Sequence, residues 1–216
     1  MRNRWAIATK WGATALLAAG LALAGSASAT LVSRGADLVY DDVLDITWTR
    51  NASLPGGSLL TWAAANAWAA NLSFAGYDDW RLPTIDLNTP TITATNCAGV
   101  SAAACAASGN ELGYMFYQNL ANVPGSNRTG TQTAVGGEEL TGIQRSYWSS
   151  TENPAGSTIA WLFNFNDGSQ FGAGEGNRLS AWAVRSGDLT AAVPEPQTFA
   201  LLLAGLGLLA WSRRRR

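Results

Sequence analysis

The chain contains no histidine, and this absence limits the chemistry that it can carry. A Ser-His-Asp triad, a Cys-His pair and ordinary histidine metal sites all need an imidazole, so these classes are excluded. Cleavage of a glycosidic bond needs only two carboxyl groups. Four glutamates are available for it, Glu138, Glu139, Glu152 and Glu175. Because carboxylates are common on any soluble surface, we expect no catalytic residue, no cofactor and no enzymatic activity.

Two short polar segments carry oxygen ligands of the kind that calcium prefers. Glu152-Asn153-Pro154 and Asn166-Asp167 are similar to ligand segments of sugar-binding C-type lectins. Those lectins, however, show Glu-Pro-Asn in the first segment, and the tryptophan of their Trp-Asn-Asp is replaced here by Phe165. Asn-Pro and Asn-Asp-Gly are also ordinary turn sequences. Glu152, Asn153, Asn166 and Asp167 are therefore weak calcium candidates, and we assign no metal site.

The only two cysteines, Cys97 and Cys105, lie close together in the sequence. A metal site would lack histidine partners, and a redox pair more often has the CxxC spacing. Outside the cytoplasm, this spacing favours a disulfide that closes a small loop. The alternatives of metal binding and redox chemistry are weaker.

The middle of the chain differs in net charge from its two ends. Seven of the fourteen basic residues but only one of the fifteen acidic residues lie in the two terminal segments, so residues 30–190 carry a net charge of about −7 and no lysine. Nucleic acids and other polyanions are bound by neutralising their charges with Lys and Arg. We therefore expect no nucleic-acid partner.

Residues 1–29 have the pattern of a secretory signal peptide. A basic leader precedes an uncharged Ala/Leu-rich run, and Ala27-Ser28-Ala29 is the small-residue pattern that a signal peptidase accepts. The apolar run is short for a bilayer, so we expect cleavage after Ala29 rather than a retained anchor.

Residues 191–216 combine three features. Val193-Pro194-Glu195-Pro196 is followed by the apolar run 198–212 and by four arginines. A helix of this length covers about 22 Å, less than a typical hydrocarbon core, and the arginines favour the cytoplasmic side. We expect a membrane-directed helix with the domain facing outward; a buried core helix is the alternative.

The three-part tail resembles the PEP-CTERM sorting signal, with Pro194, Glu195 and Pro196 as its motif. This resemblance implies processing by an exosortase, a membrane-embedded sorting enzyme. The precursor would be anchored in the inner membrane facing the periplasm, and the processed protein would reach the outer surface or the extracellular matrix. Such proteins occur in bacteria that build extracellular polysaccharide, in biofilm or floc matrices. The tail is an address and shows no activity of the domain.

Residues 30–190 are enough for one domain with a core, and two helices are predicted in it. Ser58 or Thr61 can cap the first, which ends near Leu72, and Asn110 begins the second, which ends near Leu120. The Thr/Ala/Ser-rich segment 90–108 has the character of a surface insertion. The Gly/Asn/Thr-rich segment 122–137 is predicted to be a long loop.

Strand patterns occupy both ends of this domain. Alternating apolar residues predict a hairpin over 37–48, and residues 77–84 a compact loop or short strand. The final third holds strands that begin at Tyr147, that include 161–165 with a turn at Asp167-Gly168, and that cover 179–185. Helices between small antiparallel strands predict an α+β domain, not a βαβ repeat.

Three segments together resemble the Lcl C-terminal domain family. They are Gly76-Tyr77-Asp78-Asp79-Trp80-Arg81-Leu82-Pro83-Thr84, Tyr147-Trp148-Ser149-Ser150-Thr151 and Ala181-Trp182-Ala183-Val184-Arg185. The resemblance spans nearly all of 37–187 and implies a fold related to C-type lectin-like and formylglycine-generating-enzyme-like domains. Many copies have no assigned activity. Formylglycine-type enzymes use cysteines, but Cys97 and Cys105 do not map to that role.

The motif residues have a mainly structural interpretation; they are Asp79, Trp80, Arg81, Pro83, Trp148, Trp182 and Arg185. The three indoles are expected in the core, with stacking of an exposed tryptophan on a sugar ring as the alternative. Arg81 and Arg185 are expected to pair with Asp78 or Asp79, because a buried guanidinium needs such a partner. Pro83 fixes the chain direction.

We therefore expect an exported, exosortase-processed envelope or matrix protein that binds polysaccharide or another surface partner without catalysis. A purely structural matrix protein with no glycan site is the first alternative. A carboxylate-based polysaccharide hydrolase is the second.

Overall fold

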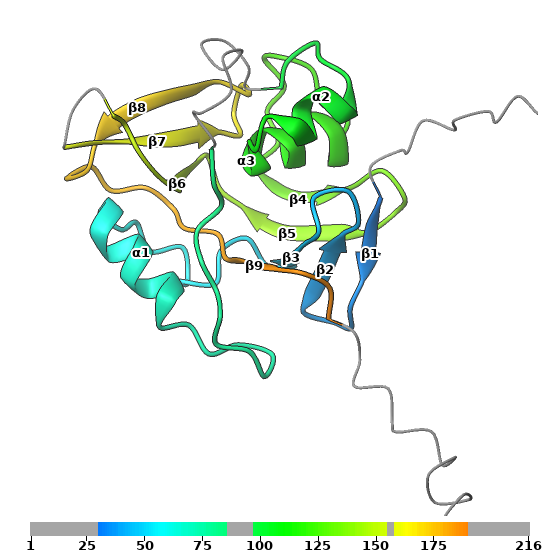
Figure 1. Cartoon of the computed structure of the whole chain (residues 1–216), viewed down its shortest axis with the longest axis horizontal. Coiled ribbons are helices and arrows are strands. Elements are labelled where there is room, and N and C mark those ends of the chain that lie inside the picture. Colours follow the sequence, from blue (N-terminus) through cyan, green and yellow to red (C-terminus); the bar gives the residue numbers. More distant parts are fainter. Residues whose placement is uncertain (1–29, 86–96, 155–157, 190–216) are drawn as a thin grey trace, which may run out of the picture.

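The computed structural model describes residues 30–85, 97–154 and 158–189 (Figure 1). These residues form an α+β domain with three small antiparallel sheets and short helices, which confirms the predicted fold class. Its relation to C-type lectin-like domains stays a prediction. The predicted signal peptide and the sorting tail lie outside the described residues. No helix of the described part is long and apolar enough to cross a membrane.

The first sheet joins the two ends of the domain. Its strands are β1 (Leu31–Ser33), β2 (Leu38–Asp41), β3 (Ile46–Thr49) and β9 (Val184–Ser186), in that order across the sheet. The hairpin predicted over 37–48 is confirmed by the pairing of β2 with β3. Because β9 pairs with β3, the last strand before the tail lies beside the first hairpin.

The other two sheets come from the second half of the chain. One pairs β4 (Gly130–Thr133) with β5 (Glu139–Ile143), and the other has the order β6 (Ser146–Glu152), β7 (Ile159–Asn164), β8 (Gln170–Gly174). The three-stranded sheet confirms the strands predicted to begin at Tyr147 and to include 161–165. Of the strand predicted over 179–185, only the end is realised, as β9 in the first sheet. The presence of β4 shows that the prediction of a loop throughout 122–137 was wrong. Polar Thr and Gln residues can form a strand once β5 supplies hydrogen-bond partners.

Both predicted helices are present, with small differences. In α1 (Trp62–Ala70) the Thr61 hydroxyl accepts a hydrogen bond from the amide of Ala64 at 3.4 Å. Asn110 caps α3 (Glu111–Tyr114) by accepting from the amide of Gly113 at 2.9 Å. The chain then continues as a π-helical segment, η1 (Met115–Asn119), instead of a single regular helix.

A further short helix, α2 (Ala102–Ala107), lies in the segment predicted to be a surface insertion. Ser101 caps it, and its alanines favour the helical conformation. Cys97 and Cys105 are buried and belong to the largest hydrophobic cluster, so the part of this segment from Cys97 onward is packed against the core. Composition alone did not reveal this, because alanine is equally common on surfaces.

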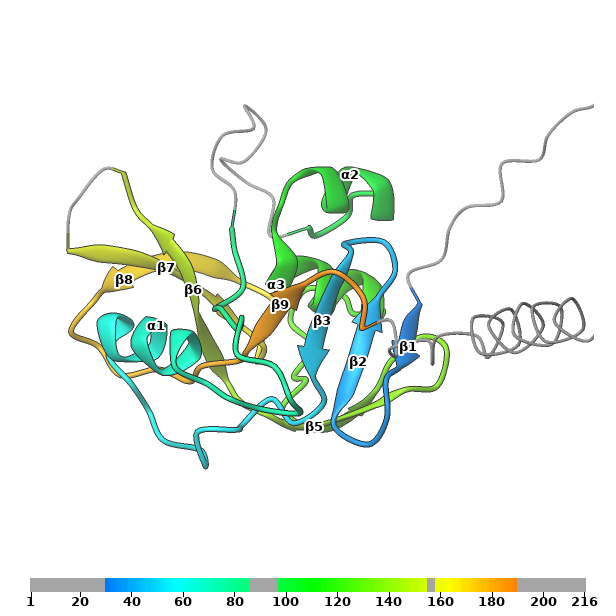
Figure 2. The same cartoon turned by 60° about the horizontal axis from the view of Figure 1, so that its bottom comes forward.

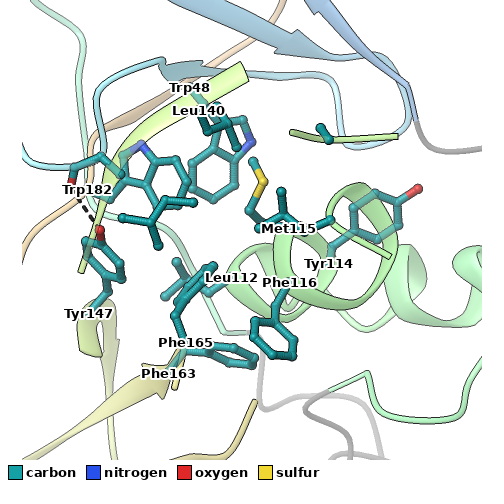
Figure 3. Close-up of a cluster of buried hydrophobic side chains, with 14 of the residues drawn as sticks. Trp48, Leu112, Tyr114, Met115, Phe116, Leu140, Tyr147, Phe163, Phe165 and Trp182 are labelled. Carbon is teal, nitrogen blue, oxygen red and sulfur yellow. Dashed lines mark hydrogen bonds between the residues drawn. The ribbon is translucent and has the colours of Figure 1, made fainter. Parts of the chain in front are cut away.

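The largest core cluster lies between the first sheet, α3 and the β6–β7–β8 sheet (Figure 3). Trp48 and Trp182 meet edge to face with ring centroids 4.8 Å apart, and Phe163 and Phe165 pack against Phe116 at 5.5 Å. Edge-to-face aromatic pairs stabilise a core beyond the area that they bury. A second cluster packs α1 against the opposite face of the β6–β7–β8 sheet (Figure 2).

Candidate functional site

A surface cavity of about 590 Å³ lies beside the first sheet. The turn 33–38 between β1 and β2 forms one wall, Ala75 and Tyr77 form another, and Leu189 at the C-terminal end of the domain completes the lining. The volume is within the range of sites that hold small molecules. We treat this cavity as the candidate site.

The wall between β1 and β2 is a tight turn. The amide of Arg34 donates to the carbonyl of Leu38 at 2.9 Å, and Gly35 takes a φ of 82° that costs little only for glycine. The turn leaves Ala36 and Asp37 exposed at the cavity rim.

The opposite wall is a second tight turn. Phe74 and Tyr77 exchange two backbone hydrogen bonds of 3.0 Å, and both residues between them have a positive φ, 53° at Ala75 and 86° at Gly76. This is the geometry of a two-residue hairpin loop, in which the second position is usually glycine. The turn presents the half-buried ring of Tyr77 to the cavity.

Arg34 connects the first wall to the C-terminal end of the domain. Its Nε and Nη2 atoms donate to the two carboxylate oxygens of Asp188 at 2.5 and 2.6 Å, and its guanidinium lies 5.1 Å from the ring centroid of Tyr40. The hydrogen bond from Arg34 holds the pKa of Asp188 below its usual value, and the same bond raises the pKa of Arg34. The Tyr40 hydroxyl donates to Asp45 at 2.8 Å, which raises the pKa of Tyr40 to about 12.

Arg185 packs against one face of the Tyr77 ring and holds the ring in place. Its guanidinium lies 4.4 Å from the ring centroid and donates to both oxygens of Asp79 at 2.7 and 2.8 Å. The hydrogen bond lowers the pKa of Asp79 and raises that of Arg185. The predicted pairing of Arg185 with Asp78 or Asp79 is thus realised with Asp79. A guanidinium held by a carboxylate keeps the aromatic ring in one orientation.

The lining combines an aromatic ring, apolar Leu38 and Leu189, and polar groups at the turn 33–38. Among the described residues that line the cavity, only Asp37 has a carboxylate. This arrangement offers a stacking surface and hydrogen-bonding groups. It does not supply the two facing carboxyl groups that hydrolysis of a glycosidic bond needs.

The three motif tryptophans lie elsewhere, in the core. Trp80, Trp148 and Trp182 are at most 3% exposed, as their strand patterns predict. Each indole donates to a backbone carbonyl: Trp80 to Tyr77 in its own segment, and Trp148 and Trp182 to the distant Leu60 and Thr49. Because these rings are buried, they do not provide a sugar platform.

Arg81 has a different partner from the one predicted. It forms a bidentate ion pair with Glu111, at 2.8 and 2.7 Å, and the same carboxylate accepts from the amide of Thr84. The prediction of Asp78 or Asp79 was wrong for Arg81, because Asp79 is engaged by Arg185, whereas Glu111, the first residue of α3, lies within reach of Arg81. Pro83 is buried, and its carbonyl accepts from the amide of Ser150 at 2.8 Å, so this segment runs beside β6.

The four calcium candidates do not form one site. Glu152 pairs with Ala160 at one end of β7, whereas Asn164, just before Asn166 and Asp167, pairs with Ser146 at the other end. Four residues of strand separate these ends by about 13 Å, too far for ligands of a single ion. Asp167 instead accepts from the amide and hydroxyl of Ser169, so the alternative of turn chemistry holds there. The described residues contain no cluster of acidic or cysteine side chains that could hold a metal.

Cys97 and Cys105 form a disulfide, with their Cα atoms 5.2 Å apart. The bond ties the segment before α2 to the helix itself, inside the main core cluster. Its position supports a structural role and not a catalytic one.

The remaining sequence candidates do not reach the cavity. None of Glu138, Glu139, Glu152 and Glu175 lines it, and Glu138 pairs with Arg50 at 2.8 Å. Sequence reasoning missed Arg34, Tyr77 and Asp188 as site residues. For Tyr77 the signal was its place beside the Asp-Asp-Trp-Arg motif; Arg34 and Asp188 lie 154 residues apart, and no local pattern joins them.

Comparison with known proteins gives a match for the domain and a separate match for the C-terminal tail. A family model described as the Lcl C-terminal domain matches residues 37–185, and one described as the PEP-CTERM protein-sorting motif matches residues 192–216. No curated protein gives a significant match. The sorting motif implies processing by an exosortase and export to the cell surface. Since the first match covers more than half of the chain, this protein belongs to the Lcl C-terminal domain family, and it carries a PEP-CTERM sorting motif at its C-terminus.

Proposed function

We propose that this exported protein binds a short segment of extracellular polysaccharide in the cavity beside the first sheet, without catalysis. The observation that carries the proposal is the Tyr77 ring, which forms a wall of the cavity and is held in place by Arg185 and Asp79. A fixed aromatic ring with polar groups around it is a general surface for stacking on a sugar. The sorting motif implies export to the cell surface, which is where such a ligand occurs.

The charge of the domain favours neutral or weakly charged saccharides as ligands. Arg34 and Arg185 at the cavity are each neutralised by an aspartate, and Asp37 at the rim adds negative charge. A strongly anionic polymer would be repelled by this acidic surface. The lining supports binding without catalysis, because acid–base hydrolysis needs a second carboxyl group in reach of the substrate.

A purely structural matrix role is the second candidate function. It is favoured by the burial of Trp48, Trp80, Trp148 and Trp182, which leaves only three partly exposed tryptophans, Trp62, Trp68 and Trp161, among the described residues. The two candidates differ in whether the cavity has a ligand.

The proposal is tested by binding of the oxidised protein to polysaccharide purified from the producing cells. Tyr77→Ala should weaken binding at least about tenfold, because the stacking surface is lost. The matched control is Phe171→Ala, since Phe171 is a 46% exposed aromatic residue on β8, on the other side of the molecule from β1 and β2 (Figure 1). Equal binding by the wild-type and Tyr77→Ala proteins would contradict the proposal, and so would the absence of saturable binding by a folded wild-type protein. Either result would favour the purely structural role.

A further inference from the structure

The arginines around the candidate cavity are neutralised in pairs. Arg34 lines the cavity, Arg185 packs against Tyr77, and Arg50 donates to the hydroxyl of Ser33 in the cavity wall at 2.8 Å. Each of the three donates to a carboxylate, in the pairs Arg34–Asp188, Arg50–Glu138 and Arg185–Asp79. The described arginines at this cavity are therefore not available to attract an anionic ligand.

Asp37 is the charged residue of the lining that has no such pair. It is exposed at the rim, and within the described part of the chain its carboxylate has no ion-pair or hydrogen-bond partner. Its backbone is nevertheless held in place, because its carbonyl accepts a hydrogen bond from the amide of Arg50 at 2.7 Å. A fixed carboxylate without a cation favours a ligand that supplies the positive charge.

The inner side of the cavity is apolar. Leu38 is only 2% exposed, and Tyr77 and Leu189 are half-buried and pack against the same small cluster. Such a surface can contact the C–H groups of a sugar ring, but burying a charge against it would be costly. A charged group of the ligand must therefore lie at the rim, beside Asp37.

We propose that the cavity selects saccharides that carry a protonated amino group, and that Asp37 is the residue that makes this selection. The proposal rests on the proposed function for the stacking of a sugar ring on Tyr77. An amino sugar meets both requirements, because its ring contacts Tyr77 and its ammonium group donates charge-assisted hydrogen bonds to the carboxylate. A polymer in which only some sugars have a free amine is still weakly charged, in agreement with the ligand class proposed above.

The test uses three tetrasaccharides with the same β-1,4 linkage that differ only in the substituent at carbon 2. This substituent is an ammonium group in the glucosamine oligomer, an acetamido group in the N-acetylglucosamine oligomer and a hydroxyl group in the glucose oligomer. A neutral hydroxyl also donates to a carboxylate, so the comparison isolates the contribution of the charge. Isothermal titration calorimetry with the oxidised protein at about pH 5.5, where amines are protonated, gives the three affinities.

The glucosamine oligomer should bind at least about threefold more tightly than the other two, as expected for a partly exposed charge pair. Salt at about 0.5 M should reduce this difference by screening. Asp37→Asn should remove the preference. The matched control is Asp42→Asn, which makes the same change of charge at an exposed position just past the opposite end of β2 and should keep the preference.

Three results would overturn the inference: equal or undetectable binding of the three oligomers, tighter binding of the acetamido form, and a preference that survives Asp37→Asn. None of them decides the proposed function, because that is tested by the effect of Tyr77→Ala on binding to the polysaccharide of the producing cells. The two failures are therefore distinguishable.

Discussion

Two arginines of the Asp-Trp-Arg and Val-Arg segments form bidentate ion pairs that differ in burial. The Glu111 side chain that holds Arg81 is 10% exposed, whereas the Asp79 side chain that holds Arg185 is 53% exposed. A buried carboxylate that loses its partner is left uncompensated, while an exposed one is stabilised by water. The same bidentate geometry therefore has different energetic weight at the two places.

The first prediction compares these pairs. Arg81→Ala should lower the free energy of unfolding by about 3 kcal/mol, because the Glu111 carboxylate stays buried with only the amide of Thr84 as a donor. Arg185→Ala should cost less, about 1 kcal/mol, because the Asp79 carboxylate that it leaves behind is 53% exposed and stabilised by water. Urea-induced unfolding measures both free energies. Equal losses would contradict the conclusion that the more buried carboxylate, Glu111, gives its ion pair the greater weight in stability.

Asp41 is the most buried carboxylate at the end of the first hairpin. It accepts hydrogen bonds from the amides of Val43 and Leu44 and from the side-chain amide of Asn119, yet burial dominates and raises the pKa of Asp41. A carboxyl group with a raised folded pKa binds its proton more tightly in the folded state. Its contribution to stability is therefore greatest below the unfolded pKa of about 3.9 and declines as the pH rises through the folded pKa.

The second prediction is that Asp41→Asn removes this decline. Among the residues that the structure describes, the Asn119 side-chain oxygen has no hydrogen-bond partner. After a rotation of the Asn119 amide, this oxygen can accept a hydrogen bond from the side-chain amide introduced at position 41. The stability of the variant relative to the wild type should thus increase from about pH 4 upward. Thermal unfolding between pH 3 and pH 7 gives this difference, and a difference that does not change with pH would contradict the account.

The Asp79 and Asp188 pairs, with lowered pKa values, act in the opposite sense and lose their contribution as the pH falls below about 4.

Elements with a strong local pattern were predictable from the sequence, and those stabilised by distant contacts were not. The hairpin 37–48 and the capped helix that follows Thr61 have their signals in adjacent residues. In contrast, α2 is a short alanine-rich helix that depends on the disulfide and the core, and β4 depends on β5. The π-helical segment after α3 likewise has no sequence signature.

The third prediction concerns α2. Such a short helix is not stable by itself, so it relies on the Cys97–Cys105 bond and on burial of both sulfur atoms. Cys97→Ala with Cys105→Ala should lower the free energy of unfolding by about 2–3 kcal/mol. Ser101→Ala, which removes only the cap, should cost about 1 kcal/mol. Chemical denaturation distinguishes the two, and an unchanged stability of the double variant would show that the loop is not attached to the core.

On the scale of the whole molecule, the candidate cavity was not predictable from the sequence. Its walls come from the 33–38 turn, from the 74–77 turn and from Leu189. The first sheet and the backbone bridge between Arg81 and Val184 bring these distant segments together. The motif tryptophans could be predicted as core because large indole rings bury well against other aromatic side chains. The address at the C-terminus could also be predicted, since its three parts are contiguous.

The fourth prediction is that divalent cations do not affect the protein. The calcium candidates lie at opposite ends of β7, so a chelator should leave both the unfolding temperature and any binding of polysaccharide unchanged. Differential scanning calorimetry with calcium and with a chelator checks this. A calcium-dependent rise of several degrees would reveal a site that the geometry does not support.

The most direct test of a non-catalytic binding site is NMR titration of the isotope-labelled, oxidised chain with saccharide fragments of the producing cells' own polysaccharide. The account predicts saturable shifts of amides confined to residues 33–38, 75–77 and 185–189, with no new reducing ends in the sample. Shifts that centre on another surface, or release of shorter saccharides during the titration, would contradict it.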